Sequence, residues 1–248
     1  MAKKKKLEIY EYMVLTPEEA TKLFWEELKK ERPDLQLIED ILAYSSVDVN
    51  IQDVEGYTTL ITAAYWGNEK LVELLLNHPE IKVNLQTEWG WTALMAAAYR
   101  GYENLVELLL KHPGIVVNAR DENGWAALMH ATERGSEKCV ELLLNHPKTN
   151  VNMQEDCGWT ALIQAVGIGR ERIVELLLKH PDIDVNLQDR DGQTALMLAV
   201  IEGNEKIVEL LLAYPGIDVN VRDEDGDTAW NLATDSIRKK FLQLNPNS

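Results

Sequence analysis

Four of the five histidines recur at a constant spacing, which makes them the first candidates for chemistry. They lie 34 residues apart and are His78, His112, His146 and His180. Histidine nitrogens commonly bind zinc, but each ligating nitrogen must lie ~2 Å from the ion. Successive packed helices are ~8–10 Å apart, so histidines repeated from helix to helix would not converge on one ion. We therefore expect no metal site, and we interpret these residues as histidines near helix C-termini, where the helix dipole favours them.

The two cysteines and the fifth histidine offer little more as nucleophiles or bases. Cys139 aligns with Leu105 and Ile173 of neighbouring segments, which predicts a core position. Cys157 stands beside a turn glycine and is expected to be exposed and oxidisable, but no base is evident near it. His130 lies alone within a helical segment, and we interpret it as a packing residue rather than a general base.

A short glycine-rich segment and a series of glutamates complete the candidates for catalysis. Residues 167–169 begin like a phosphate-binding loop, but position 172 is arginine and no strand is predicted before it. The glutamates recur with the 34-residue spacing, as a solvated outer face would, at Glu73, Glu107, Glu141, Glu175 and Glu209. No set of nucleophile, base and acid remains. We predict that the protein is not an enzyme and carries no cofactor or metal.

Aromatic side chains form the pattern that is most suggestive of binding. One aromatic residue follows a glycine in four successive segments, at Tyr57, Trp91, Trp125 and Trp159. Tryptophan and tyrosine are enriched among the residues that dominate binding energy at protein interfaces. Two interpretations stay open: these rings contact a partner, or they stack on one another and stiffen the protein. We favour binding.

The elements that must position these residues follow from an internal repeat with a period of 34 residues. The period relates six glycines, which are Gly56, Gly90, Gly124, Gly158, Gly192 and Gly226. It also relates six Val-Asn pairs, which start at positions 49, 83, 117, 151, 185 and 219, and five prolines, at positions 79, 113, 147, 181 and 215. Full repeats are therefore expected at 49–82, 83–116, 117–150, 151–184 and 185–218.

The repeat at 83–116 predicts two helices that cannot bury their apolar faces alone. Thr92 can cap a short helix at 93–99 through its hydroxyl, and Gly101 ends this helix. A longer helix is predicted at 103–111, and its leucines and valine form a face too wide for one hairpin to cover. Pro113 lacks the amide that another turn would need. Each unit thus requires its neighbour, which is the property of a solenoid.

Altered units at both ends are predicted to cap this array. Residues 16–48 form the N-terminal cap, where Thr16 and Glu19 can form a capping box ahead of a helix with Phe24, Trp25 and Leu28. Residues 219–248 form the C-terminal cap, with a basic helix at 236–244. Residues 1–15 are expected to be a basic, flexible segment.

Charge and composition restrict the partners. The formal net charge of the 248 residues is −16, and without the four lysines at positions 3–6 it is −20 (−16 minus 4). Such a surface repels phosphate backbones and anionic lipid, so we expect neither nucleic acid nor a membrane as partner. The lysine run fits a solubilising tail better than a nuclear-localisation or lipid-binding patch. No apolar stretch suits a membrane span or signal peptide, and two cysteines with no glycosylation motif favour a cytoplasmic protein.

The repeat resembles the ankyrin repeat, over residues 33–244. The tetrapeptides 92–95 and 194–197 match the start of the family's first helix, and the triple leucine and the Val-Asn pair match as well. The period is 34 rather than the usual 33, the family's proline and histidine are absent from the tetrapeptide, and Ala126 replaces a capping threonine. The resemblance implies an all-α solenoid of stacked antiparallel helix pairs with β-turn or hairpin loops between them.

The resemblance also implies a concave groove that contacts partners. Carried over position by position, its binding residues are Tyr57, Tyr65, Trp66, Trp89, Trp91, Tyr99, Arg100, Trp125, Glu133, Arg134 and Trp159. Gly167 and Ile168 would leave a shallow patch in the fourth repeat. As turn residues, the tryptophans after the glycines are expected to lie outside the core.

These observations predict a monomeric protein-interaction module whose groove binds a protein or peptide with basic and apolar groups. A first alternative is a reader of methylated lysine or a basic tail, in which tryptophans and carboxylates form a cage. A second alternative is an engineered ankyrin binding scaffold, because repeats this similar occur in such scaffolds and in recently duplicated natural arrays. For a natural protein, we expect an intracellular location, with host-directed proteins of intracellular microbes as one source.

Overall fold

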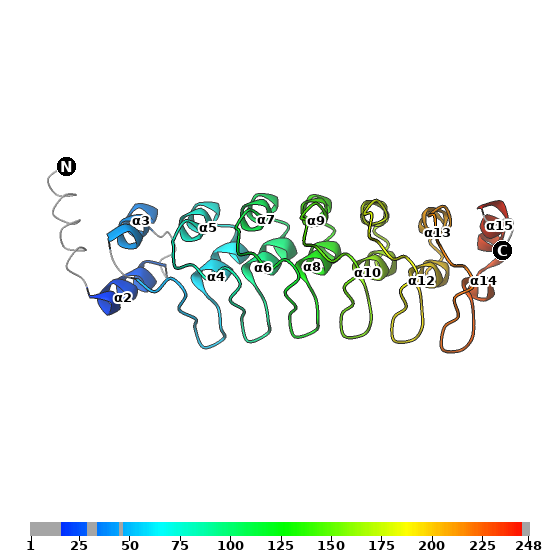
Figure 1. Cartoon of the computed structure of the whole chain (residues 1–248), viewed down its shortest axis with the longest axis horizontal. Helices are drawn as coiled ribbons and strands as arrows, with labels where there is room; N and C mark the ends of the chain where they lie inside the picture. The colour runs from blue at the N-terminus through cyan, green and yellow to red at the C-terminus, as the bar shows by residue number, and fades with distance from the viewer. Residues whose placement is uncertain (1–15, 29–33, 45–46, 245–248) are drawn as a thin grey trace.

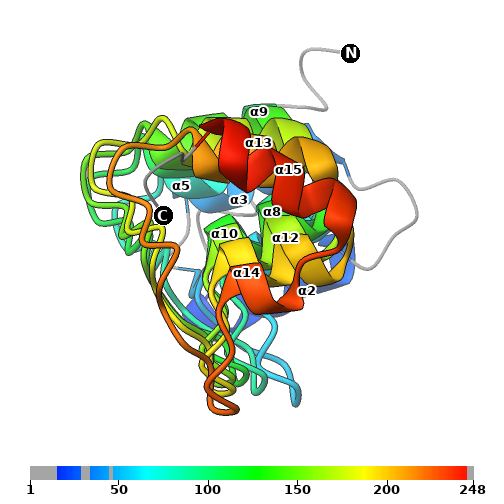
Figure 2. The same ribbon diagram turned by 90° about the vertical axis from the view of Figure 1, so that its right-hand side faces the viewer.

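The computed structural model describes residues 16–28, 34–44 and 47–244, and within them it is a solenoid of stacked helix pairs (Figure 1). The first helices of the pairs are α2 (Pro17–Leu28), α4 (Thr59–Trp66), α6 (Ala93–Arg100), α8 (Ala127–Arg134), α10 (Ala161–Gly167), α12 (Ala195–Ile201) and α14 (Ala229–Leu232). The second helices are α3 (Leu35–Tyr44), α5 (Glu69–Leu76), α7 (Glu103–Leu110), α9 (Glu137–Leu144), α11 (Glu171–Leu177), α13 (Glu205–Leu212) and α15 (Asp235–Leu244). Viewed along the stack, the helices form two layers and the turns project from one side (Figure 2). The expected all-α solenoid is confirmed.

The projecting turns depend on glycine for two reasons. Gly90 has a φ of +79°, a conformation that residues with a Cβ adopt rarely. A Cβ at this position would also lie 2.7 Å from Cα of Asp121, in the turn of the next repeat. Neighbouring turns are joined at the same place, where the Glu122 amide donates to the Trp89 carbonyl oxygen at 3.0 Å. The recurring glycine therefore allows successive turns to pack edge to edge.

Threonine side chains begin most of the first helices, as predicted. In α6, Thr92 Oγ1 accepts a hydrogen bond from the Met95 amide at 3.2 Å, and Gly101 ends the helix with a φ of +72°. The exception is α8, where Ala126 stands at the cap position and provides no side-chain hydrogen bond. The sequence-based expectation of a missing cap in the third repeat is confirmed.

The asparagines of the first five Val-Asn pairs link consecutive repeats, a role that the sequence analysis did not assign. Asn84 Nδ2 donates to the Gly114 carbonyl oxygen at 2.7 Å, and Asn84 Oδ1 accepts from the Val116 amide at 2.8 Å. Equivalent pairs of bonds are made by Asn50, Asn118, Asn152 and Asn186. Both polar atoms of the side chain are thus used to fix the spacing between loops.

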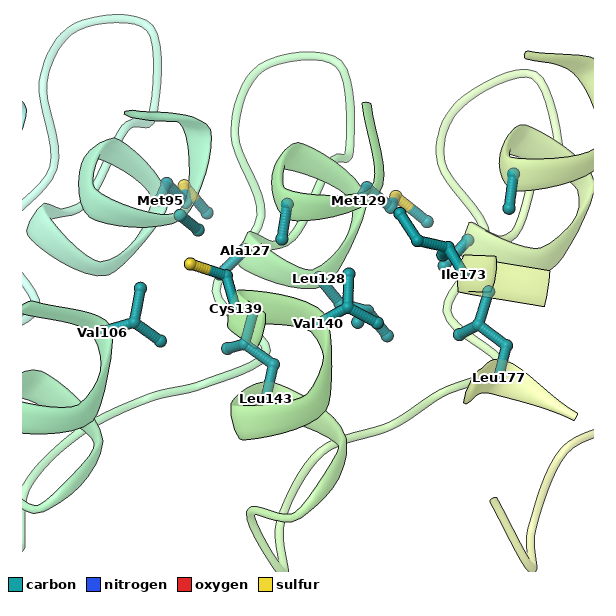
Figure 3. Packing of buried hydrophobic residues seen from close by; sticks show 14 of the residues in the cluster. Met95, Val106, Ala127, Leu128, Met129, Cys139, Val140, Leu143, Ile173 and Leu177 are labelled. Atoms are coloured by element: carbon teal, nitrogen blue, oxygen red, sulfur yellow. The ribbon is translucent and has the colours of Figure 1, made fainter. Parts of the chain in front are cut away.

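A continuous hydrophobic core runs between the two helix layers, from the N-terminal to the C-terminal cap. Phe24 and Phe241 are buried at its two ends. In the centre, side chains such as Met95, Cys139 and Leu143 come from neighbouring repeats and meet between the layers (Figure 3). Cys139 is fully buried, and burial raises the pKa of its thiol, with a smaller opposing effect from a hydrogen bond to Ser136. Its predicted core position is confirmed.

The prediction that the second helix is longer than the first is wrong for four of the five full repeats and holds only for α12 and α13, with seven and eight residues. Helices α6 and α7 both contain eight residues, although the second helix was expected to be the longer. The reason is the end of α7, where Lys111 serves as C-cap and the following residues turn away ahead of Pro113.

None of the helices in the described part of the chain is long and apolar enough to cross a membrane.

The capping box predicted at the start of α2 is present. Thr16 and Glu19 form the reciprocal capping box, with the Thr16 amide 2.9 Å from Glu19 Oε2 and the Glu19 amide 3.3 Å from Thr16 Oγ1. In α15, Lys240 Nζ lies 2.5 Å from Glu209 Oε1 of α13. The expected flexible segment 1–15 and the side chains of Trp25 and Leu28 lie outside the residues that the structure describes.

Candidate partner-binding groove

A pocket of about 480 Å³ opens where α4, α6 and α8 meet the turns that precede them. Its lining consists of six aromatic residues, three acidic residues and four others: Tyr57, Tyr65, Trp89, Trp91, Tyr99 and Trp125; Asp121, Glu122 and Glu133; Ile61, Ala96, Asn123 and His130. Turn residues form one side of the pocket and residues of the first helices form the other. Seven of the eleven predicted binding residues therefore come together in one place.

Ala96 has the smallest side chain in the lining of the pocket. The equivalent position of the next repeat, 34 residues later, is His130, and the one after that is Gln164. Where α8 presents an imidazole to the groove, α6 presents only a methyl group. The rings of Trp91 and Tyr99 stand on either side of this position in the sequence and pack edge to face, with centroids 5.3 Å apart.

His130 and Asp121 form the polar floor of the pocket. His130 Nε2 lies 3.0 Å from Asp121 Oδ2, and both side chains are almost completely buried. The His130 ring packs between two tryptophans, with ring centroids 4.6 Å from Trp91 and 5.3 Å from Trp125. His130 is thus a packing residue, as predicted, and it also carries a hydrogen bond that the sequence analysis did not anticipate.

The carboxylate of Asp121 is held by three donors. Its Oδ1 accepts hydrogen bonds from the Trp125 amide at 2.8 Å and the Asn123 amide at 2.9 Å, in addition to the His130 contact on Oδ2. Burial acts to raise the pKa of Asp121, but the hydrogen bonds from His130 and the two backbone amides outweigh it, and the pKa is lowered overall. Asp121 therefore carries a negative charge at neutral pH.

The charge of the pocket is of one sign. Asp121, Glu122 and Glu133 are its ionisable residues besides His130 and the tyrosines, and its lining contains no lysine or arginine. Glu133 is oriented by Gln164 of the next repeat, whose Nε2 donates to Glu133 Oε2 at 3.2 Å. Aromatic faces with carboxylates beside them attract cations through the ring quadrupole and through direct Coulomb interaction.

The two predicted binding arginines lie outside the lining of the pocket. Arg100 Cζ lies 5.0 Å from the ring centroid of Tyr65 and 5.8 Å from that of Tyr102. Arg134 Cζ lies 4.9 Å from the ring centroid of Tyr99. Each arginine thus stacks on a tyrosine of the preceding repeat and covers one face of a ring that lines the pocket.

Trp66 and Trp159 lie at the two sides of the pocket rather than in it. Trp66 is 69% exposed and packs edge-on against Tyr65, with centroids 5.3 Å apart. Trp159 belongs to the fourth repeat and lies against Gly167, where an added Cβ would be 3.3 Å from the indole ring. The shallow patch expected at Gly167 is therefore partly filled by Trp159.

The tryptophans after the turn glycines lie beside the core rather than in it. Trp91, Trp125 and Trp159 are half-buried and pack against the hydrophobic core. None of them is among the buried core residues, as expected, but the Trp91 indole leans from its turn onto the first helices of its own and the next repeat, where it contacts Tyr99 and His130. These rings contribute to stability as well as to the pocket surface.

A family assignment follows from comparison with known proteins. The model of the family described as ankyrin repeats (three copies) matches the chain in three overlapping segments, residues 30–121, 79–154 and 128–223. The chain belongs to the ankyrin-repeat family. The crystal structure of the ankyrin repeat domain of Bcl-3, described as a unique member of the IkappaB protein family, is similar in fold. Its TM-score is 0.79 at 23% sequence identity, and the match covers 93% of this chain and 99% of that chain. No curated protein matches the chain in sequence.

Ankyrin repeats are protein-interaction modules and are generally not enzymes. The four periodic histidines, which the sequence offered as candidates for chemistry, have a structural role in this module. His78 Nδ1 accepts a hydrogen bond from the Glu80 amide at 3.2 Å. His112, His146 and His180 make the same contact two residues ahead. These histidines thus stabilise the turn that directly follows the second helix of each repeat, near its C-terminus as predicted. Cys157 is exposed, as predicted.

Six lining residues of the pocket are not among the predicted binding residues: Ile61, Ala96, Asp121, Glu122, Asn123 and His130. Asp121 shares its place in the repeat with Asp53, Asp189 and Asp223, and each of these carboxylates accepts from the amide four residues later. The recurrence of aspartate at this position could have identified Asp121 as a hydrogen-bond acceptor within the turn. The contact with His130 had no such signal, because histidine occurs at this position in one repeat only.

Proposed function

We propose that this ankyrin-repeat chain binds a protein or peptide partner along its concave groove, with the aromatic pocket as the central anchoring site. The observation that carries the proposal is the pocket of about 480 Å³ with six aromatic rings in the middle of the first three full repeats. Aromatic residues that line a concave, partly desolvated site are the usual centres of binding energy at interfaces. The chain would act as a monomer, without catalysis, and its location would be cytoplasmic.

The partner should combine apolar groups with positive charge. The pocket supplies aromatic surface and three carboxylates, and the chain as a whole carries a net charge of −16. A basic partner would be attracted at long range and would associate faster at low salt. The same charge disfavours nucleic acid and anionic membranes as partners.

The experiment is affinity capture from cell lysate with a double Trp91→Ala/Trp125→Ala variant beside the wild type. The matched control is Trp230→Ala, which removes a partly exposed indole from the C-terminal repeat, far from the pocket. Proteins captured by the wild type and the control, and lost with the double variant, would support the groove. Equal capture by all three would contradict the proposal, provided that denaturant melts show the double variant to be folded.

A second candidate function is the reading of a methylated lysine or a basic tail. Its specific support is the combination, in a single pocket between adjacent repeats, of aromatic faces such as Trp91 and Trp125 with the carboxylates of Glu122 and Glu133. Such cages bind alkylated ammonium groups through cation–π attraction. Binding of lysine peptides that strengthens with methylation would support this function, and equal binding of a norleucine peptide would contradict it.

A further inference from the structure

Arg100 and Arg134 occupy the same place in consecutive repeats, as the last residue of α6 and of α8. Arg100 Cζ lies 5.0 Å from the ring centroid of Tyr65, and Arg134 Cζ lies 4.9 Å from that of Tyr99. The two arginines therefore make the same contact, one repeat apart, with tyrosines that line the pocket. Because a guanidinium that stacks on a ring loses freedom to turn, both side chains are held at the rim of the groove before a partner binds.

Both guanidinium groups keep hydrogen-bond donors for a ligand. The two side chains are exposed, and neither forms an ion pair within the described part of the chain. The one hydrogen bond between these groups and a described residue joins Arg100 Nη2, as donor, to Tyr102 Oη at 3.4 Å. A guanidinium has five N–H donors in a planar fork that matches the two oxygens of a carboxylate. Carboxylates are therefore the groups that these arginines fit best.

Exposed apolar side chains stand at the same repeat position on either side of the arginines. Trp66 precedes them at the end of α4 and is 69% exposed, and Ile168 follows them directly after α10 and is 42% exposed. The first helices of these four repeats pack side by side (Figure 1). We call Trp66, Arg100, Arg134 and Ile168 the rim row. A partner that crosses the first helices thus meets an apolar residue, two arginines and a second apolar residue.

The spacing of the rim row suits a polyproline II segment. Packed helices lie ~8–10 Å apart, so consecutive members of the row are separated by about that distance. A polyproline II helix advances ~9 Å in three residues and returns to the same face after those three. In a β-strand, by contrast, residues three apart point to opposite faces. Of these two extended conformations, polyproline II therefore places every third side chain of a partner against the row.

We propose that Arg100 and Arg134 bind two carboxylates that stand three residues apart in a polyproline II segment of the partner. Apolar residues three positions before and after this pair contact Trp66 and Ile168. The proposal rests on the proposed function, since it names further groups that the partner presents to the same groove. Basic side chains of the segment face the carboxylates of the pocket. They also offset the repulsion between acidic residues and a chain of net charge −16.

Two synthetic peptides of equal composition test this register without knowledge of the partner. The in-register peptide is Ac-Leu-Pro-Lys-Glu-Pro-Lys-Glu-Pro-Lys-Leu-NH2, and the control peptide is Ac-Leu-Pro-Lys-Pro-Glu-Glu-Lys-Pro-Lys-Leu-NH2. Their net charges are equal, and neither glutamate of the control peptide faces the rim row. In calorimetric titrations of the full chain at physiological salt, the in-register peptide should bind about tenfold more tightly, because each of two exposed ion pairs contributes about threefold.

Variants of the arginines identify the contact. Arg100→Gln/Arg134→Gln removes both charges and keeps part of each apolar stem, so the affinity for the in-register peptide should fall about tenfold, to that of the control peptide. The matched control is Arg172→Gln, which removes an exposed arginine from α11 in the layer of second helices. Because distant exposed charges are screened, this variant should leave both affinities unchanged within about twofold. Denaturant melts of each variant show whether it is folded.

The outcomes separate the role of the arginines from the role of the groove. Equal affinity of the wild type for the two peptides would overturn the proposal, as would a preference that persists in the double arginine variant. Failure of both peptides to bind would overturn it as well, and the capture experiment would still test the groove independently. Peptides that bind the Trp91→Ala/Trp125→Ala variant as tightly as the wild type would instead contradict the proposed function, whatever their preference for register.

Discussion

His130 Nε2 lies 3.0 Å from Asp121 Oδ2, and this contact ties the first helix of the third repeat to the turn that precedes it. The pair occurs once in the array, whereas the turn carboxylate itself recurs in other repeats. Asp121 thereby has a function beyond the turn, since it also fixes the imidazole between Trp91 and Trp125. One buried carboxylate thus stabilises the turn and orients a residue of the pocket.

Replacement of Asp121 by alanine should destabilise the protein by about 3 kcal/mol, because three donors lose a charged acceptor in a buried site. The matched control is Asp189→Ala. Asp189 Oδ1 accepts from the amides of Asp191 and Gln193 in the same way, but no histidine stands at position 198 to bond with it. The difference between the two variants in denaturant melts measures the contribution of the His130 contact. Equal losses would show that this contact adds nothing.

The same carboxylate should make folding sensitive to acid. The folded-state pKa of Asp121 is lower than that of an unfolded aspartate, which is about 3.9. The unfolded state therefore binds the proton more readily, and stability increases with pH in this window. The contribution of Asp121 is complete above the unfolded pKa and disappears as pH falls through the folded value. Asp121→Asn should show a shallower loss of unfolding free energy between about pH 5 and pH 2 than the wild type.

The third repeat should gain stability from a single added hydroxyl. Ala126→Thr restores the side-chain cap that Thr92 and Thr160 provide in the neighbouring repeats, and the unfolding free energy should rise by about 1 kcal/mol. The reverse control, Thr160→Ala, should lower it by a similar amount. Denaturant melts of both variants measure the two effects. A destabilised Ala126→Thr protein would show that the local packing around α8 cannot accept a threonine.

Much of the fold could be predicted because the residues that each turn and each helix end require recur in every repeat. Gly90 and its equivalents identify the turns, Thr92 and Gly101 the ends of the first helix, and the lack of a cap at Ala126 was visible from alignment alone. Each of these features depends on backbone conformation or on a local hydrogen bond, which a short sequence pattern can encode.

The arrangement of the candidate site could be predicted only in part. The aromatic positions were found because they follow the repeat or the family's groove pattern. The stacking of Arg100 on Tyr65 and the His130–Asp121 contact were not, because they depend on side-chain directions between repeats. The repeat position of His130 has no constant residue, since the neighbouring repeats have Ala96 and Gln164 there. A residue that occurs once cannot be interpreted from periodicity.

Saturating zinc should not raise the melting temperature. His78 and its three equivalents each direct Nδ1 to a backbone amide within their own repeat. In the described part of the chain, no group of three or more histidine, cysteine, aspartate or glutamate residues is arranged to hold an ion. A zinc-dependent stabilisation of several kcal/mol in a thermal melt, of the kind that structural zinc sites give, would contradict this prediction.

Trp91 offers the most direct separation of binding from stability. Its indole is half-buried and contacts both Tyr99 and His130, so Trp91→Ala should lower the unfolding free energy by about 2 kcal/mol. That loss is smaller than the ~3–5 kcal/mol typical of a fully buried tryptophan. If Trp91 anchors the partner, affinity for a partner captured with the wild type should fall about thirtyfold. Titration of that partner against Trp91→Ala, with a denaturant melt of the same preparation, measures both effects. Unchanged affinity together with a large loss of stability would mean that the aromatic residues after the turn glycines stabilise the fold and that the partner binds elsewhere.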